Sequence, residues 1–152
     1  MTGSTSGLGP LLLHAAATWF MAGVIWMVQL VHYPLFAFTD RARFGAMATA
    51  HSERIRWIVG PAMLIELGTA LWLLARPPAG APRALLVAGL ALLAVIWIST
   101  ALLQGPDNGR LVAGFDADVH RRLVTTNWLR TIAWSTRGIL VSLLLLQVFR
   151  SR

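Results

Sequence analysis

The chain contains no cysteine and no lysine, and only 12% of its residues are charged. Without cysteine, the protein has no disulfides, no iron–sulfur cluster and no covalently attached c-type haem. A soluble domain of this size carries about twice this charged fraction. In its place, 57% of the 152 residues are hydrophobic, and the mean hydropathy is +0.66. This composition is typical of an integral membrane protein.

Four apolar blocks account for most of the hydrophobic residues, and they cover about residues 11–33, 55–75, 84–104 and 123–149. Each block holds close to the ~20 apolar residues that a helix needs to cross a bilayer. The blocks are separated only by short loops. We therefore predict an all-α integral membrane four-helix bundle with up-down topology, in which residues 1–152 form a single transmembrane domain.

Turn and cap residues predict where these helices begin and end. We expect Pro34 to end the first helix and the segment Gly105–Gly109 to end the third, because proline and glycine interrupt helices. Asp40 is a candidate N-cap of the second helix, and Asp116 or Asp118 of the fourth.

The basic residues are thirteen arginines, and the formal net charge is +7. They cluster beside the apolar blocks rather than on a solvated face, so we expect a topology signal and no nucleic-acid partner. Seven lie on one side of the predicted membrane and four on the other: Arg41, Arg43, Arg54, Arg56, Arg110, Arg121 and Arg122 against Arg76, Arg83, Arg150 and Arg152. Positive charge favours the cytoplasm. This predicts that both termini lie on the non-cytoplasmic side.

The fourth block is unusual because it contains Asn127, Arg130 and Arg137. A charge near the bilayer centre costs at least about 2.5–3.5 kcal/mol. Glu66 lies about 18 Å into the second helix and Arg137 about 22 Å into the fourth, which runs in the same direction. The matching depths predict a Glu66–Arg137 ion pair. Such a pair serves either helix register or function.

Polar residues also gather at one end of the predicted bundle. In an up-down arrangement this end holds His32 and Tyr33, His51, Gln104 and Asn108, and His120, with Asn127 and Arg130 nearby. Individually, these histidines are typical of interfacial anchors or solvated loops. Together, so many polar groups indicate a cavity or a bound group. His14 alone lies near the opposite face.

The residue types restrict the chemistry of such a site. His32, His51 and His120 are candidate ligands of a metal ion such as zinc, iron or copper. A non-covalent haem with one axial histidine is a further candidate cofactor. A classical di-iron site is disfavoured, because it uses about four carboxylates and the predicted spans contain only Glu66.

The segment "TALLQGPDNGRL" (Thr100–Leu111) resembles the end of the third span in the anthrone-oxygenase-like family of small four-helix membrane proteins. In that family a tryptophan and an arginine follow in the fourth span, similar to Trp128 or Trp134 and Arg137, although the spacing here differs. "LLHAAATWFMAGVIW" and "IVGPAM" resemble the haem-binding four-helix protoporphyrinogen oxidases, whose functional positive residue in the third helix has no counterpart here. "HYPLF…TNWLRT" resembles uncharacterised bacterial membrane proteins. This resemblance implies a bacterial inner-membrane location and no particular activity.

Two functions are consistent with these features. The first is a membrane oxidoreductase or oxygenase-like enzyme acting on a hydrophobic small molecule that enters from the bilayer. In it, His32, His51, His120, Asn127 and Arg130 would be catalytic, and Tyr33, Gln104, Asn108 and Trp128 would bind substrate. The second is a non-catalytic accessory subunit of a larger membrane complex or homo-oligomer. A proton-coupled exporter built on Glu66 is disfavoured, because Arg137 would hold the carboxylate ionised.

Overall fold

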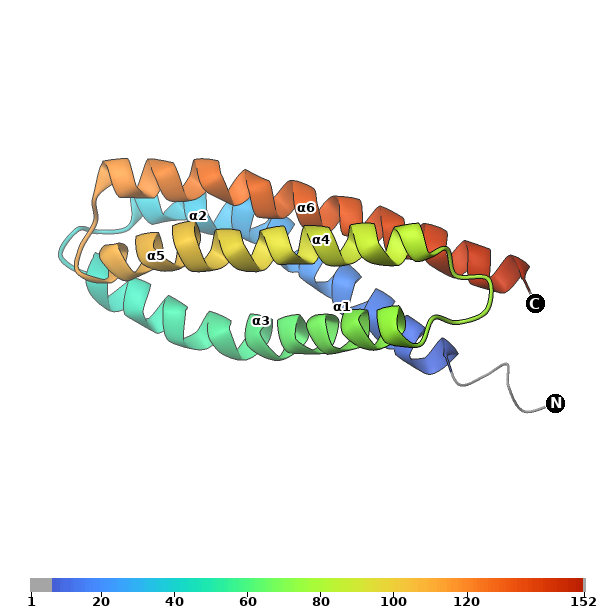
Figure 1. Cartoon of the computed structure of the whole chain (residues 1–152). Helices are drawn as coiled ribbons and strands as arrows, with labels where there is room; N and C mark the ends of the chain where they lie inside the picture. Colours follow the sequence, from blue (N-terminus) through green and yellow to red (C-terminus); the bar gives the residue numbers. More distant parts are fainter. Residues whose placement is uncertain (1–6, 152) are drawn as a thin grey trace.

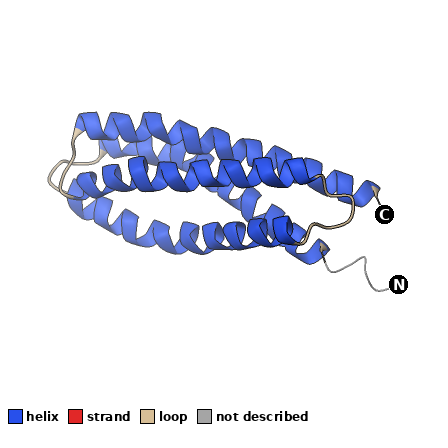
Figure 2. Cartoon of the chain, viewed as in Figure 1, coloured by secondary structure: helices blue, strands red, loops and turns tan. Residues whose placement is uncertain are grey.

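The computed structural model describes residues 7–151, and this part of the chain is built of helices joined by short loops, without any strand (Figure 2). Four continuous helices are long and apolar enough to cross a membrane. They cover Leu8–Phe38, Phe44–Ala75, Arg83–Val112 and Ala117–Arg150. The predicted all-α four-helix bundle is thereby confirmed.

Two of the four long helices contain several elements. The first consists of α1 (Leu8–Met27), the π-helical turn η1 (Val28–His32), α2 (Tyr33–Leu35) and the 3₁₀ turn η2 (Phe36–Phe38). The second is α3 (Phe44–Ala75). The third consists of α4 (Arg83–Ser99), the π-helical turn η3 (Thr100–Gln104) and α5 (Gly105–Val112). The fourth is α6 (Ala117–Arg150).

The loops and termini divide between the two ends of the bundle (Figure 1). The α2–α3 and α5–α6 loops lie at one end, and the α3–α4 loop lies at the other with the C-terminus of α6 and the start of α1. Helix α1 packs against α3 and α6, and α4 packs against the same two helices. Helices α3 and α6 therefore lie across the bundle from each other, and only long side chains from them meet at its centre.

The first and third helices run further than their prolines predicted. Neither Pro34 nor the Gly105–Gly109 segment ends its helix. In both helices a π-helical turn ends two residues before a proline, Pro34 or Pro106. A proline ring collides with the carbonyl four residues earlier, and here that carbonyl lies inside the wider π turn. The wide turn thus lets the helix continue.

The residue that closes the π turn differs between the two helices. The Gly105 N–H donates to the Thr100 carbonyl in η3, and the Tyr33 N–H donates to the Val28 carbonyl in η1. A β-carbon on Gly105 would lie 2.9 Å from the Thr100 carbonyl oxygen. Glycine therefore relieves a close approach in η3, although a π turn as such does not need it.

The predicted caps have different outcomes. Asp116 caps α6, because its carboxylate accepts hydrogen bonds from the backbone N–H groups of Asp118 and Val119 at 2.8 and 3.0 Å. Asp40 does not cap α3, and that prediction was wrong. Its carboxylate accepts from the Ala42 N–H in the preceding turn, and α3 begins later, at Phe44, with Arg43 in the N-cap position.

The bundle has two apolar core clusters with a polar layer between them. One surrounds Ile25, Phe36 and Trp134 at the end that holds η1 and η3, and the other surrounds Leu11 and Leu73 at the end with the termini. Many large apolar side chains instead face outward, including Trp19, Phe20, Leu64, Leu102 and Ile132. Outward-facing apolar surface on this scale matches a bilayer environment.

Candidate functional site

A pair of histidines joins the first two helices at the end that holds the π turns. His32 is the last residue of η1, and His51 lies in the second turn of α3. His32 Nε2 and His51 Nδ1 are 2.7 Å apart, so one proton lies between two ring nitrogens. Within residues 7–151, His32 Nδ1 and His51 Nε2 make no hydrogen bond. The pair therefore has two free nitrogens, one on each ring.

Phe36 holds the three histidines of this end together. Its ring centre lies 5.3 Å from that of His32, 5.5 Å from that of His51 and 6.4 Å from that of His120. His120 Nε2 donates to the Tyr33 backbone carbonyl over 2.8 Å. The predicted convergence of three histidines is thus present, but the third one ties α6 to α2 rather than facing the other two.

This geometry does not form the expected three-histidine metal centre. Within residues 7–151, no group of three or more histidine, cysteine or acidic side chains could hold a metal ion. The physical reason is the direction of the nitrogens and the place of Phe36. His32 Nε2 and His51 Nδ1 face each other, and His120 Nε2 faces the Tyr33 carbonyl. The Phe36 ring packs against all three imidazoles, where a shared metal ion would have to lie. Binding of a haem stays a prediction that these contacts do not address.

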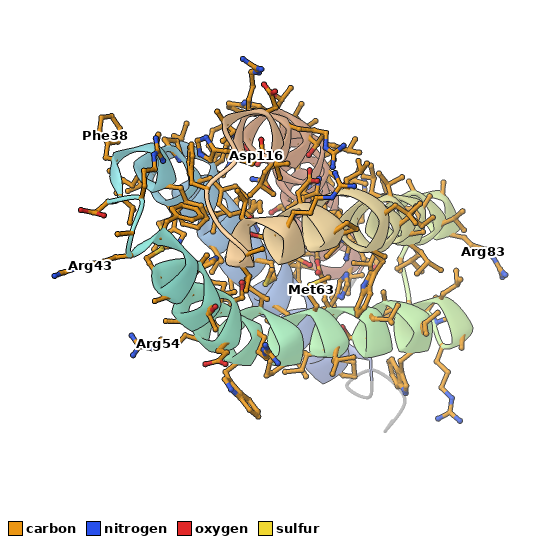
Figure 3. The ribbon with its side chains drawn as sticks, turned by 90° about the vertical axis from the view of Figure 1, so that its left-hand side faces the viewer. Phe38, Arg43, Arg54, Met63, Arg83 and Asp116 are labelled. Atoms are coloured by element: carbon orange, nitrogen blue, oxygen red, sulfur yellow. The ribbon has the colours of Figure 1, made fainter. Side chains whose placement is uncertain are left out.

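An apolar groove lies beside the histidine pair. It has a volume of about 790 Å³ and is bounded by α1, η1 and α3. Its walls include Trp19, Phe20, Gly23 and Met47, and its polar side chains are His32, His51 and Arg54. The Arg54 side chain extends away from the bundle (Figure 3). A hydrophobic molecule in this groove would meet the two histidines as its main polar neighbours.

A smaller cavity, which we call the inner chamber, lies on the other side of His51. Its volume is about 290 Å³, and it extends between α3, η3, α5 and α6. Its polar walls come from Tyr33, His51, Ser52, Arg56, Thr100, Gln104, Asn108 and Arg130. Four side chains, Val24, Val28, His51 and Ile55, line both the groove and the inner chamber. His51 is the only polar residue of these four.

The donors of the inner chamber are incompletely paired. Gln104 is fully buried, and its oxygen accepts from Ser99 Oγ at 2.9 Å, yet its Nε2 has no partner. Arg130 Nη1 reaches Thr100 Oγ1 at 3.4 Å, while its Nε has no partner. Asn108 Nδ2 donates to the Tyr33 hydroxyl and the Gln104 backbone carbonyl. Buried donors without partners are rare and ask for an explanation.

Two of the predicted site residues lie elsewhere. Asn127 is buried and donates to Gln29 Oε1 at 2.9 Å, and Gln29 Nε2 in turn reaches the Val124 carbonyl. This contact joins α6 to η1 and lines neither cavity. Trp128 is partly exposed and packs edge-to-face on Trp26, with ring centres 5.7 Å apart. On α6, Asn127 and Trp128 lie about 60° and 160° around the helix axis from Arg130, and one sequence does not determine which of these faces is buried.

The polar layer at the bundle centre is built around Glu66. Arg137 Nη2 and Nε lie 2.9 and 3.0 Å from Glu66 Oε1, and both side chains are buried. Thr18 Oγ1 donates to the same oxygen at 2.9 Å, and Trp134 Nε1 donates to Oε2 at 3.0 Å. Every carboxylate oxygen thus has a donor. The ion pair expected from the matching depths is present, with two further partners that depth alone did not indicate.

His14 also contacts this layer, from its position near the start of α1. Arg137 Nη2 donates to His14 Nε2 over 3.4 Å, so the ring carries its proton on Nδ1, which faces Thr69 Oγ1 at 2.8 Å. Arg137 Nη1 donates to the Gly89 carbonyl. Thr18 had no sequence signal, because the surface that a helix buries depends on its neighbours. Trp134 was indicated only as one of two candidates in the family resemblance.

No protein-family model, curated protein or solved structure matches this chain.

Proposed function

We propose that the protein is an integral-membrane enzyme of the oxidoreductase or oxygenase-like class, acting on a hydrophobic small molecule taken from the lipid. The observation that carries this proposal is the His32–His51 pair, whose nitrogens lie 2.7 Å apart in the wall of an apolar groove. A titratable pair beside an apolar pocket is the arrangement that general acid–base catalysis requires.

The pair would act as a proton relay. His51 Nε2 takes a proton from the substrate, and the proton on His51 Nδ1 passes to His32 Nε2. His32 Nδ1 then releases its own proton to a water molecule. Each ring ends neutral, with its proton on the opposite nitrogen. The anion left on the substrate is the electron-rich species that reacts with O₂ in an oxygenase. The resemblance to the anthrone-oxygenase-like family supports an aromatic substrate.

The experiment uses anthrone as the probe substrate, with purified protein in lipid nanodiscs. One anthrone and one O₂ would give one anthraquinone and one water, measured as oxygen uptake and product formed. His51→Gln should bind anthrone but react about 100-fold more slowly or worse, the usual loss of a general base.

Glycine variants give a matched control for the groove. A β-carbon on Gly23 or Gly60 meets no atom within 4 Å, but only Gly23 lines the groove. Gly23→Phe should abolish anthrone binding, and Gly60→Phe should leave it unchanged. Binding and oxidation no greater than in empty nanodiscs would contradict the enzyme proposal and favour the accessory-subunit function.

We also propose that the protein resides in a bacterial inner membrane with both termini on the non-cytoplasmic side. The support is the excess of arginines around the α2–α3 and α5–α6 loops. Reporter fusions at Arg152 and within residues 76–83 should report the same side, and a fusion near Arg110 the other. Any other pattern contradicts the topology.

A further inference from the structure

We propose that the inner chamber binds the anionic oxygen group of an amphiphilic ligand whose apolar body occupies the groove. This inference rests on the proposed function for the groove, and it adds the chemical class of the ligand: a carboxylate, phenolate or enolate on an apolar or aromatic body. The argument comes from the charge, the unpaired donors and the position of the inner chamber.

The charge of the inner chamber has one sign. Arg130 and Arg56 contribute to its walls, and no acidic residue does. The nearest buried carboxylates have other partners, because Glu66 pairs with Arg137 and Asp107 pairs with Arg122. Among residues 7–151, Arg130 forms no ion pair. A guanidinium inside a bundle without a carboxylate is a site for an external anion.

The donors of the inner chamber point to an oxygen acceptor. Gln104 has no exposed surface, and its Nε2 donor has no partner. The Nε of Arg130 has none either. Both atoms only donate hydrogen bonds, and both belong to the same cavity wall. A ligand oxygen that accepts from both would satisfy two buried groups that no residue of the described chain satisfies.

The position of the inner chamber explains the apolar body. Val24, Val28, Ile55 and His51 form the shared wall between it and the groove. A ligand with its oxygen near Arg130 and Gln104 would place the adjoining atoms at His51. The 290 Å³ of the inner chamber suits a small head group, and the 790 Å³ of the groove suits an apolar body.

The test compares two isosteric probes, 2-naphthoate and the uncharged 2-naphthamide, in equilibrium binding to protein in zwitterionic nanodiscs near pH 7. We expect the naphthoate to bind about tenfold more tightly or better, because a charge-assisted bond to arginine is worth roughly that factor. Arg130→Gln should remove the preference, and Gln104→Leu should weaken it.

The matched control is Arg43→Gln. The Arg43 side chain extends away from the bundle (Figure 3), so this change removes one positive charge without touching the inner chamber. It should leave the preference unchanged. If Arg130→Gln does not fold, Arg130→Lys takes its place in the test. This variant keeps the charge but loses the Nε donor, so it should retain part of the preference for naphthoate.

Equal binding of both probes to the wild type, or a preference that survives Arg130→Gln, would overturn the inference. Phosphatidylglycerol added to the nanodiscs should not compete with naphthoate, because its head group and chains exceed the inner chamber. Competition would overturn the small-molecule assignment. The binding assay does not depend on turnover, so the two proposals can fail separately. A protein that prefers naphthoate but does not oxidise anthrone contradicts only the proposed function. A protein that oxidises anthrone but shows no preference for naphthoate contradicts only this inference.

Discussion

The protein holds two groups of buried polar residues, and they differ in how completely their hydrogen bonds are satisfied. In the central layer, both oxygens of Glu66 have donors, and Arg137 contacts Glu66, Gly89 and His14. In the inner chamber, Gln104 Nε2 and Arg130 Nε have no partner within the described chain. The central layer satisfies its hydrogen-bonding groups with its own side chains, whereas the two unpaired donors of the inner chamber need an acceptor from a ligand.

The central layer joins helices to one another, whereas the inner chamber is the proposed ligand site. Both groups lie on long apolar helices, and each contains one arginine of α6. Arg137 belongs to the central layer, and Arg130 belongs to the inner chamber. The central layer has a cavity of only about 20 Å³ beside it, whereas the inner chamber has about 290 Å³. A charge becomes available to a ligand when neighbouring side chains leave both space and a free donor.

The largest effect should come from breaking the central ion pair. Glu66→Leu leaves Arg137 as an uncompensated buried charge and should lower the free energy of unfolding by about 3–5 kcal/mol. The double variant Glu66→Leu/Arg137→Leu should recover much of this loss, because both charges are removed together. Unfolding of purified protein in mixed micelles measures both.

A double variant no more stable than the worse single variant would mean that the two residues are not coupled. Arg121→Leu supplies the control in the same helix. Arg121 is exposed and pairs with Asp118, so it shares no partner with Glu66. Its effect should add to that of Glu66→Leu, with no recovery in the double variant.

The histidine pair should matter less for stability than the central layer. In His32→Leu/His51→Leu both partners of the hydrogen bond become apolar, which is nearly neutral when no buried group is left unpaired. We expect a change within about 1 kcal/mol of wild type, together with loss of turnover. A loss as large as that of Glu66→Leu, measured in the same micelles, would place the pair in the structural group.

The smallest effect concerns Asp116 at the start of α6, outside both polar groups. Hydrogen bonds from the Val119 and Asp118 N–H groups hold the pKa of the Asp116 carboxyl below its usual value. A carboxyl whose pKa is lower in the folded state than in the unfolded state stabilises the fold at pH values above the unfolded-state pKa. This stabilisation is lost as the pH falls through the folded-state pKa. Asp116→Ala should therefore lower the unfolding temperature at neutral pH, and the difference should shrink below about pH 4.

Asp118→Ala is the control for that comparison. Asp118 lies in the same turn and has the same charge, but its carboxylate contacts only the exposed Arg121. It should change the unfolding temperature less than Asp116→Ala does. An equal effect at all pH values would indicate that the charge near the helix N-terminus matters and the cap does not.

Much of this architecture could be predicted from composition and spacing. Four apolar blocks predicted four helices, and equal depth along parallel helices predicted that Glu66 and Arg137 meet. The helix ends were predicted less well. Pro34 and Gly105–Gly109 were interpreted as stops, but each follows or overlaps a π turn that lets the helix continue. The sequence did contain a signal for the π turns, because Pro34 and Pro106 lie at the same end of their two helices.

The sequence by itself determined the number of helices and the apolarity and polar content of each, because these depend only on residue types and their order. The rotation of each helix about its axis was decided by tertiary packing. That rotation turned Arg130 and Gln104 toward a cavity, Asn127 toward Gln29, and Trp128 toward the outside. The physical reason is that a helix with apolar residues on all sides has no single face that burial in a membrane favours. Its orientation is set by small residues, π turns and buried hydrogen bonds on the neighbouring helices.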